Sequence, residues 1–224
     1  MTNEIRIAID GPAAAGKSTI AKLVAEKLGY TYIDTGAMYR ALTYKAIRAG
    51  IDLDKAADVE ALLPGTEIVL KAGDKGQSVW LDGQDVTDEI RTDAVTNGVS
   101  AASAHAGVRA YMVDAQRKMA EEGGVVMDGR DIGTAVLPDA ELKVFMTASV
   151  EERARRRHAE NLRRGFDSSL EQLAQEIALR DKKDSEREVS PLTQAGDAVL
   201  LDTTSLSISE AADAIMELVR EKVD

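Results

Sequence analysis

The stretch Gly11-Pro12-Ala13-Ala14-Ala15-Gly16-Lys17-Ser18 decides which kind of fold this sequence can adopt. It fits the pattern of a glycine, four residues and then Gly-Lys-Ser or Gly-Lys-Thr, which binds phosphate when it lies between a strand and a helix. Ile5-Arg6-Ile7-Ala8-Ile9 before it has the β-branched composition of a buried strand. After it, apolar residues recur with a helical period at Ile20, Leu23, Val24 and Leu28. The stretch therefore has the strand–loop–helix context that phosphate binding requires.

The chemistry expected of such a loop follows from its residue types. Backbone N–H groups and the positive end of the helix dipole bind phosphate oxygens. Lys17 would reach the outer phosphates of a nucleotide, and the hydroxyl of Ser18 would be a ligand for Mg²⁺. The simpler interpretation is a glycine-rich turn that only starts a helix. The agreement between the pattern and both flanking elements favours the phosphate-binding loop.

Length, charge and cysteine content exclude several classes of protein. The 224 residues suffice for one domain with insertions, so we expect a single domain over residues 1–224. A formal net charge of −11 argues against a nucleic-acid or anionic-membrane partner. We see neither a signal peptide nor an apolar run long enough to span a bilayer. The chain has no cysteine, which is compatible with the cytoplasm, where we expect it to act as a monomer.

Strand-like and helix-like segments alternate along most of the chain. Apolar, strand-like runs occur at residues 5–9, 30–33, 125–127, 142–146 and 198–202, with helical patterns between them. One of these patterns extends over residues 93–122. Such alternation predicts an α/β fold with an open, five-stranded parallel sheet flanked by helices, and puts the phosphate-binding loop at its carboxyl edge. Residues 64–92 break the pattern, because two short strand-like runs there predict a small antiparallel β insertion.

Polar residues gather where two of the predicted core strands end. Asp34-Thr35-Gly36-Ala37-Met38-Tyr39-Arg40 follows the second strand, and by itself it favours a surface arginine and a core tyrosine. Asp128-Gly129-Arg130-Asp131-Ile132-Gly133 follows the third strand. Phosphate-binding α/β proteins place a carboxylate near Mg²⁺ at such a position, although an ordinary strand-to-helix turn would use similar residues. Two acids flanking an arginine favour the functional interpretation.

A cluster of arginines over residues 149–164 is unusual in so acidic a chain. Ser149 and Glu152 predict a helix N-terminus, which is followed by Arg153, Arg155, Arg156, Arg157, Arg163 and Arg164. One interpretation is a solvated helix paired with its own glutamates. The other is an arginine-rich helical lid over residues 150–167 that closes over phosphates, because guanidinium groups bind phosphate through two parallel hydrogen bonds.

A bound nucleoside triphosphate could serve a switch, a motor or a kinase. The sequence contains neither Asp-x-x-Gly nor an Asn/Thr-Lys-x-Asp base-reading motif, so it lacks the features of a switch. A motor usually needs more chain and more subunit contacts. A small-molecule kinase needs a second, arginine-rich pocket, and this sequence has arginines near several strand ends. Phosphoryl transfer depends mainly on positioning and charge neutralisation, which such residues supply.

At this point three segments resemble a known family, the bacterial cytidylate (CMP) kinases, which are nucleoside monophosphate kinases with a P-loop. Two are the strand-end segments described above, and the third is Arg180-Asp181-Lys182-Lys183-Asp184-Ser185-Glu186-Arg187. The β-rich insertion before Arg91 matches as well, and the resemblance covers essentially the whole chain. It implies transfer of the γ-phosphoryl group of ATP to CMP or dCMP, with Mg²⁺ bound to the ATP.

The resemblance also implies roles for individual residues. ATP would bind to Gly11, Pro12, Ala13, Ala14, Ala15, Gly16, Lys17, Ser18 and Thr19, with Arg153 and Arg157 on its phosphates. The acceptor would lie against Thr35, Tyr39 and Arg40, and its phosphate on Arg40, Arg130 and Arg187. Cytosine would be read by Ser100, Arg109 and Asp131, and the sugar held by Arg180 and Asp184. Lys17, Asp128, Arg130 and Arg187 would form the catalytic centre. Either Ser18 or Thr19 could supply the hydroxyl for Mg²⁺.

Two alternatives from different classes remain open at this stage. One is a P-loop kinase with another acceptor, such as a different nucleotide or a small metabolite. The other is a non-enzymatic nucleotide- or RNA-binding module that uses the arginines between residues 153 and 164. Acceptor-dependent turnover of ATP would favour a kinase, and salt-sensitive RNA binding without turnover would favour the module.

Overall fold

A parallel sheet of five strands forms the centre of the molecule. The computed structural model describes residues 4–73, 76–163 and 165–223. The strands run in the order β2-β6-β1-β7-β8, and each neighbouring pair is parallel. The predicted α/β fold is therefore confirmed. The strands are β1 (Arg6–Asp10), β2 (Thr31–Asp34), β6 (Val125–Gly129), β7 (Leu142–Thr147) and β8 (Val199–Asp202).

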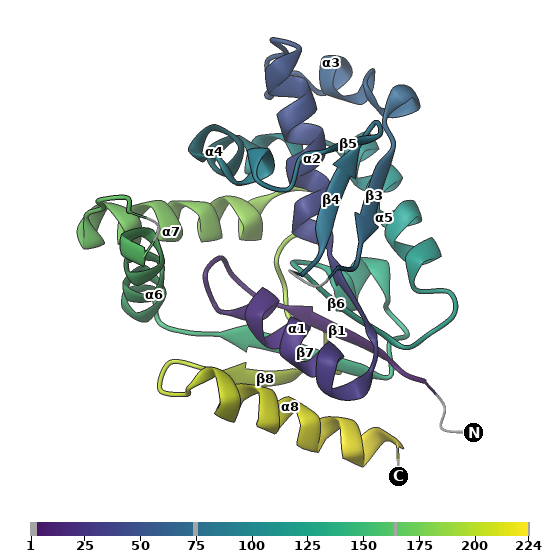
Figure 1. The fold of residues 1–224 in the computed structure, drawn as a ribbon, viewed down its shortest axis with the longest axis vertical. Coiled ribbons are helices and arrows are strands. Elements are labelled where there is room, and N and C mark those ends of the chain that lie inside the picture. Colours follow the sequence, from purple (N-terminus) through teal and green to yellow (C-terminus); the bar gives the residue numbers. More distant parts are fainter. Residues whose placement is uncertain (1–3, 74–75, 164, 224) are drawn as a thin grey trace.

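Helices cover both faces of this sheet (Figure 1). On one face, Ile20 of α1 (Lys17–Leu28) and Ile215 of α8 (Ile208–Val223) pack with Ile7 and Ile9 of β1. On the other face, β6 packs against the π-helical turn Ile132–Val136 and α5 (Ala106–Met119). Because apolar side chains cover both faces, the central strands are apolar at almost every position, as parallel strands in such sheets are.

Two helices replace the single helical segment predicted over residues 93–122. They are α4 (Asp93–Ala102) and α5, separated by three residues. The ring of His105 contacts the carbonyl oxygen of Leu53 at 2.7 Å, and the carbonyl of Ser103 accepts a hydrogen bond from Arg109. The predicted continuity was wrong because side chains bind backbone groups that a continuous helix would pair with each other, namely the carbonyl of Ser103 and the N–H of Gly107, which donates to Glu60 at 2.7 Å. A helical period in the sequence continues across so short a break.

The predicted antiparallel insertion is confirmed as a three-stranded sheet. It consists of β3 (Ile68–Lys71), β4 (Ser78–Leu81) and β5 (Gln84–Asp85). Its buried side chains, among them Val79 and Leu81, pack against α2 (Thr35–Arg48). The short helices Ala56–Glu60, Leu63–Gly65 and Glu89–Arg91 complete this part of the fold.

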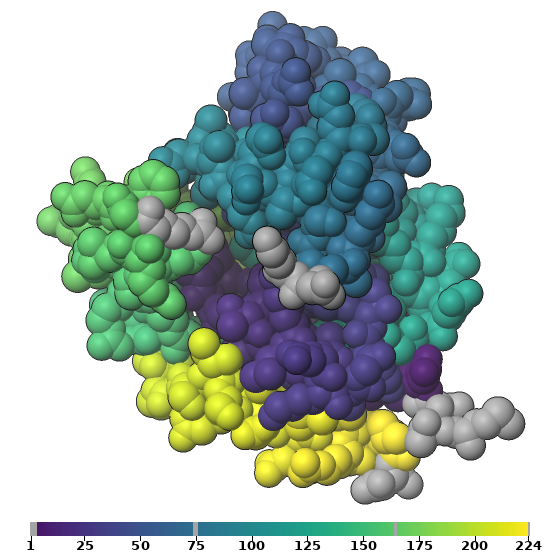
Figure 2. Space-filling view, in the orientation of Figure 1, coloured from purple at the N-terminus to yellow at the C-terminus, as the bar shows by residue number. Residues whose placement is uncertain are grey.

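The arginine-rich segment forms a helical hairpin at one side of the sheet (Figure 1). Its helices are α6 (Val150–Arg163) and α7 (Leu170–Glu186), while Arg164 lies outside the described residues. The two helices share a small apolar cluster of Ala154, Leu173 and Ile177. In the space-filling view this hairpin (green) lies to the left of the purple surface around α1, and the inserted sheet (blue to teal) lies above that surface (Figure 2).

Candidate functional site

The loop of residues 11–16 turns sharply at positions that exclude most side chains. Gly11 has a φ of 146°, and a Cβ atom there would collide with the carbonyl oxygen of Met146. Gly16 has a φ of 92°, in the region that favours glycine. The ammonium group of Lys17 turns back across the loop and donates to the carbonyl of Pro12 at 2.7 Å. The loop therefore encloses a buried cation at the N-terminus of α1, which is an arrangement suited to phosphate.

A buried carboxylate, that of Asp128, lies at the end of β6 beside this cation. Its Oδ2 accepts a hydrogen bond from the hydroxyl of Ser18 at 2.8 Å, and its Oδ1 accepts one from the hydroxyl of Tyr32 at 2.7 Å. Burial and the neighbouring Asp34 raise the pKa of Asp128 to about 6. Burial, with Arg130 nearby, lowers the pKa of Lys17 to about 7. Both groups can therefore change protonation when a polyanion enters.

The oxygens around Ser18 suit a magnesium ion that arrives with its nucleotide. A hydroxyl and a carboxylate are the hard oxygen donors that Mg²⁺ prefers. Within the described ranges no cluster of three or more His, Cys, Asp or Glu side chains could hold a metal. Phosphate oxygens and water would therefore complete its coordination, as is usual for this ion. Of the two candidate hydroxyls, Ser18 contacts Asp128, whereas Thr19 is exposed.

Cations from three distant segments, Arg40, Arg130 and Arg180, gather beside the loop. Burial lowers the pKa of Arg180 to about 9, and the positive charges of Arg130 and Arg40 lower it further. Burial likewise lowers the pKa of Arg40 to about 10, with Arg130 among the neighbours that contribute. Asp184 offsets part of this charge through a 3.0 Å hydrogen bond from Nε of Arg130. Such crowding of buried positive charge is costly without an anion, and it marks the region as an anion-binding site.

A second buried group of charges is centred on Asp131. Its Oδ2 is paired with Arg109, and its Oδ1 lies 3.6 Å from the guanidinium of Arg187. The Arg109 guanidinium stacks over the ring of Tyr39 at 5.3 Å, and Nε of Arg187 donates to the carbonyl of Ser190 at 2.6 Å. This arrangement offers donors and an acceptor in fixed positions, as recognition of a polar ring requires.

Buried polar atoms without a hydrogen-bond partner concentrate in the same region. A buried donor or acceptor left unpaired costs about 1–3 kcal/mol, so such atoms usually await a ligand or water. Four of those found in the described part of the chain belong to residues predicted to bind the acceptor, namely Tyr39, Arg109, Arg180 and Arg187. The other two are on Gln116 and Asp181. The unpaired atoms therefore coincide with the predicted acceptor site.

The arginines of α6 reach the loop in a different way from the one the sequence predicted. Arg153 is buried, and it donates to the carbonyls of Ala13 at 3.0 Å and Ala148 at 2.9 Å while pairing with Asp181 at 2.6 Å. Arg156, which the sequence analysis did not single out, donates to the carbonyl of Ala15 at 3.3 Å. Arg157 pairs with Glu160 and contributes to the electrostatic environment of Arg40. Thus two of these arginines hold the loop's backbone.

The structure also places the remaining predicted residues. The hydroxyl of Thr35 donates to the main-chain carbonyl of Asp128 at 2.7 Å, so it joins α2 to the end of β6. Arg40 donates to the hydroxyl of Thr96 at 2.9 Å. Ser100 is half-buried and lies on α4, the first α-helix after the inserted sheet.

Sequence reasoning missed Asp10, which holds the backbone that follows β6 in place. It is the last residue of β1, and its two carboxylate oxygens accept hydrogen bonds from the backbone N–H groups of Ile132 at 2.8 Å and Gly133 at 2.7 Å. It therefore fixes the segment that carries Arg130 and Asp131. Burial raises the pKa of Asp10 to about 6. The signal that could have found it is an acid directly after an apolar strand, the same signal that identified Asp128.

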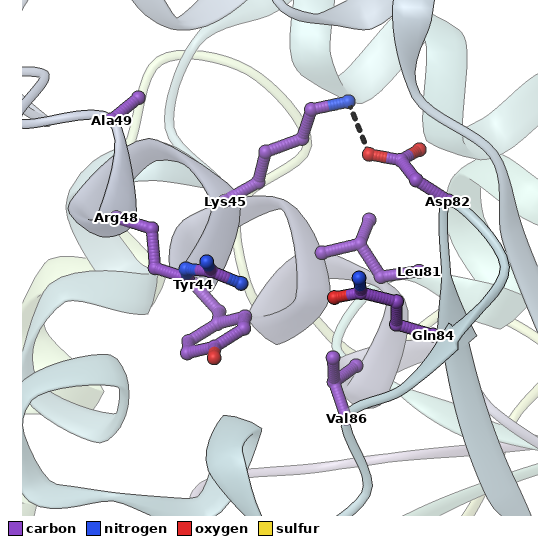
Figure 3. Close-up of a pocket in the computed structure, with 8 residues that line it drawn as sticks. All are labelled: Tyr44, Lys45, Arg48, Ala49, Leu81, Asp82, Gln84 and Val86. Carbon is purple, nitrogen blue, oxygen red and sulfur yellow. Dashed lines mark ion pairs between the residues drawn. The ribbon is translucent and has the colours of Figure 1, made fainter.

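A surface pocket of about 360 Å³ lies between α2 and the inserted sheet, apart from these groups (Figure 3). Lys45 and Asp82 form an ion pair of 2.6 Å at its rim. None of the residues predicted to bind ATP or CMP lines it, so it is not part of the candidate site. The lining residues are Tyr44, Lys45, Arg48, Ala49, Leu81, Asp82, Gln84 and Val86.

Comparison with known proteins identifies the family. The cytidylate kinase family model matches residues 7–221. The chain belongs to the cytidylate kinase family. It is 60% identical over 223 residues to a cytidylate kinase of Geobacillus sp. (strain WCH70), with 100% of both chains covered. It is 59% identical over 222 residues to the cytidylate kinase of Bacillus subtilis (strain 168), with 99% of both chains covered. The resemblance that the sequence motifs indicated, and the predicted kinase activity, are therefore confirmed.

Solved structures of other kinases share the fold of this cytidylate kinase family member. A shikimate kinase from Bacteroides thetaiotaomicron superimposes with a TM-score of 0.50 at 18% identity, covering 96% of this chain and 98% of that chain. A gluconokinase from Sinorhizobium meliloti gives a TM-score of 0.50 at 16% identity, covering 99% and 95%. At such identities the likeness concerns the fold alone. Within the described ranges, no helix is both long and apolar enough to cross a membrane.

Proposed function

We propose that this protein transfers the γ-phosphoryl group of ATP to CMP or dCMP, giving CDP or dCDP and ADP. Membership of the cytidylate kinase family makes it an ATP-dependent nucleoside monophosphate kinase. The observation that carries the choice of acceptor is the pair of adjoining charge clusters. One, around Arg40, Arg130 and Arg180, suits the phosphate together with its sugar. The other, around Asp131, suits a base with both donors and acceptors.

The donor nucleotide would lie along the loop of residues 11–19. Its phosphate oxygens would accept hydrogen bonds from the backbone N–H groups at the start of α1, and Lys17 would turn from the carbonyl of Pro12 to the outer phosphates. Ser18 would hold Mg²⁺, which would neutralise charge on the phosphate oxygens and help to align them. Arg157 would contact the donor phosphates, and Arg153 would support them through the carbonyl of Ala13.

The acceptor would lie between the end of β6, α2 and α7. We assign its phosphate to Arg40, Arg130 and Arg187, and its sugar to Arg180 and Asp184. The base would be bound by Ser100, Arg109 and Asp131, with Thr35 and Tyr39 beside it. Unpaired Nε atoms on Arg109 and Arg180 support these assignments, because a bound nucleotide would satisfy them.

The reaction then needs positioning and charge neutralisation from the protein. An oxygen of the acceptor phosphate attacks the γ-phosphorus, a new P–O bond forms, and the bond to the β-γ bridging oxygen breaks to release ADP. Lys17 and Arg130 would stabilise the charge that spreads over the transferring group, and Asp128 would help to orient the acceptor. Residues 150–167 would act as the lid that excludes water, which would otherwise hydrolyse ATP.

An acceptor panel tests the proposal. ADP release from ATP is measured with CMP, dCMP, AMP and a non-nucleotide alcohol such as shikimate in turn. We expect rapid release only with CMP or dCMP. Equal rates with AMP or with the alcohol would show that the acceptor has been assigned wrongly. The insertion boundaries at residues 64–92, the monomeric state and the cytoplasmic location stay predictions.

A further inference from the structure

We propose that Tyr32 is a positioning residue for phosphoryl transfer, and that Gln77 of the inserted sheet holds Tyr32 in place. This inference rests on the proposed function, since it concerns the carboxylate of Asp128 beside the phosphate-binding loop. Both residues lie outside the three motifs that the sequence analysis used.

The first observation concerns the carboxylate itself. Each of its oxygens accepts a hydrogen bond from a hydroxyl, Oδ2 from Ser18 at 2.8 Å and Oδ1 from Tyr32 at 2.7 Å. Two donors on opposite oxygens fix both the position and the rotation of the carboxylate plane. Ser18 lies in the first turn of α1, directly after the loop, whereas Tyr32 comes from β2. The Tyr32 hydroxyl also interacts with that of Ser18, so its removal would free one side of Asp128 and leave the backbone of the loop unchanged.

The second observation concerns the edge of the sheet. The N–H of Thr31 donates to Gly124 at 2.8 Å, next to β6, so in a parallel strand the backbone groups of Tyr32 and Asp34 face away from β6. The side-chain amide of Gln77 binds two of these outward groups. Its Nε2 donates to the carbonyl of Tyr32 at 2.6 Å, and its Oε1 accepts from the N–H of Asp34 at 3.2 Å.

The side chain of Gln77 thus pairs the outward backbone groups of this edge strand, as the backbone of a sixth strand would. Gln77 directly precedes β4, at the end of the inserted sheet that points toward the core (Figure 1). Three hydrogen bonds thus link the insertion to α1: Gln77 binds Tyr32, Tyr32 binds Asp128, and Asp128 binds Ser18. The same insertion packs on α2, which carries the acceptor-site residues Thr35, Tyr39 and Arg40. Docking of the insertion therefore sets the acceptor side and the carboxylate together.

The test uses the full chain with Tyr32→Phe and Gln77→Leu, which remove the polar groups and keep the size of the side chains. Tyr30→Phe is the control for Tyr32, because its hydroxyl bonds to the backbone of Ile5 and not to Asp128. Gln84→Leu, an exposed glutamine of the same inserted sheet, is the control for Gln77. Each rate is expressed per folded enzyme, with the folded fraction taken from the unfolding curve at the assay temperature.

For Tyr32→Phe we expect kcat to fall about 10- to 30-fold, the effect of one hydrogen bond to a charged group, with KM for CMP changed by less than about twofold. Gln77→Leu should lower kcat by about 3- to 10-fold, and the double variant should be no slower than Tyr32→Phe within about twofold, because Gln77 acts through Tyr32. Both controls should keep the wild-type kcat.

Three results would overturn the proposal: a kcat for Tyr32→Phe within twofold of wild type, a change confined to KM, or effects that multiply in the double variant. The wild-type rate with CMP tests the proposed function separately. If the wild type phosphorylates only another acceptor, the proposed function is wrong, and the same comparison of variants with that acceptor still decides the role of Tyr32.

Discussion

The hydroxyl of Ser18 lies 2.8 Å from Oδ2 of Asp128, although 110 positions separate the two residues in the chain. The first turn of α1 and the carboxyl end of β6 therefore meet at one hydrogen bond. This contact exists because β1 and β6 pair in parallel, which brings the residues that follow both strands to one edge of the sheet.

Replacement of Lys17 by alanine should abolish most of the activity and leave the fold intact. The side chain is buried, but its hydrogen bond to the carbonyl of Pro12 is local to the loop and joins no other element of the fold. We expect kcat to fall by about 10²- to 10³-fold, as for the loss of one donor to a transition-state oxyanion. Steady-state kinetics and a circular-dichroism melting curve measure the two effects. Lys27→Ala, which removes an exposed partner of Asp213, is the control and should behave as wild type.

Replacement of Arg187 by alanine should weaken binding of the acceptor and not of ATP. One guanidinium nitrogen of Arg187 is buried without a hydrogen-bond partner, and it lies near Asp131. Loss of a hydrogen bond to a charged group costs about 2 kcal/mol, which corresponds to a rise of about 30-fold in KM for CMP. KM for ATP should stay unchanged, and the exposed Arg163→Ala should alter neither constant. An unchanged KM for CMP in Arg187→Ala would remove this residue from the site.

Arg153 and Arg155 should differ sharply in their contribution to stability. Arg153 is buried and bridges the loop to Asp181 of α7, whereas the side chain of Arg155 is 71% exposed and pairs only along its own helix with Glu152. Removing one partner of a buried pair costs about 3–5 kcal/mol, while an exposed pair contributes less than about 1 kcal/mol. Denaturant unfolding of Arg153→Ala and Arg155→Ala measures the difference. Similar free energies of unfolding for the two variants would contradict the bridging role.

The contribution of Asp10 to the free energy of unfolding should decrease as pH rises. Burial raises the pKa of Asp10 from 3.8 to about 6, so the folded state binds its proton more tightly than the unfolded state does. The stability that this gives is complete below about pH 4 and is lost as pH rises through about 6. The difference in unfolding free energy between wild type and Asp10→Asn should therefore fall by up to about 3 kcal/mol over this window and stay constant above pH 7. A difference that grows with pH would contradict the assignment.

Asp10 and Asp128 illustrate what a sequence can and cannot reveal about this site. Both are acids that directly follow an apolar strand, yet Asp10 stands next to the glycine-rich motif and its own role was hidden by that motif. The alternation of strands and helices predicted the sheet, because apolar periodicity is a local property. The break between α4 and α5 escaped because it depends on contacts such as that of His105 with Leu53.

For the arginines of α6, the sequence likewise predicts the shared helix face but not the contacts that each side chain makes with other elements. Arg153, Arg156 and Arg157 follow a helical spacing of three and four, so the sequence places them on one face of the helix. It does not say which of them binds the loop's carbonyls, because that depends on how α6 sits against residues 13–15. Glu152 pairs with Arg155 and Arg156, as the interpretation of a helix paired with its own glutamates expects, while Arg153 and Arg156 hold the loop. Closure of this helix over phosphates stays a prediction. Tyr32 and Gln77 lie 45 positions apart and leave no local signal at all.

The ratio of kcat/KM for CMP to that for UMP tests the central claim most directly. This claim is that Asp131 and Arg109 recognise the base of the acceptor, while other arginines bind the phosphates of the two nucleotides. UMP carries a carbonyl where cytosine has its amino group, so a buried site built for that amino group should prefer CMP by a large factor, up to roughly 10⁴. We predict a ratio above about 100 at pH 7. A ratio near 1 would contradict the account.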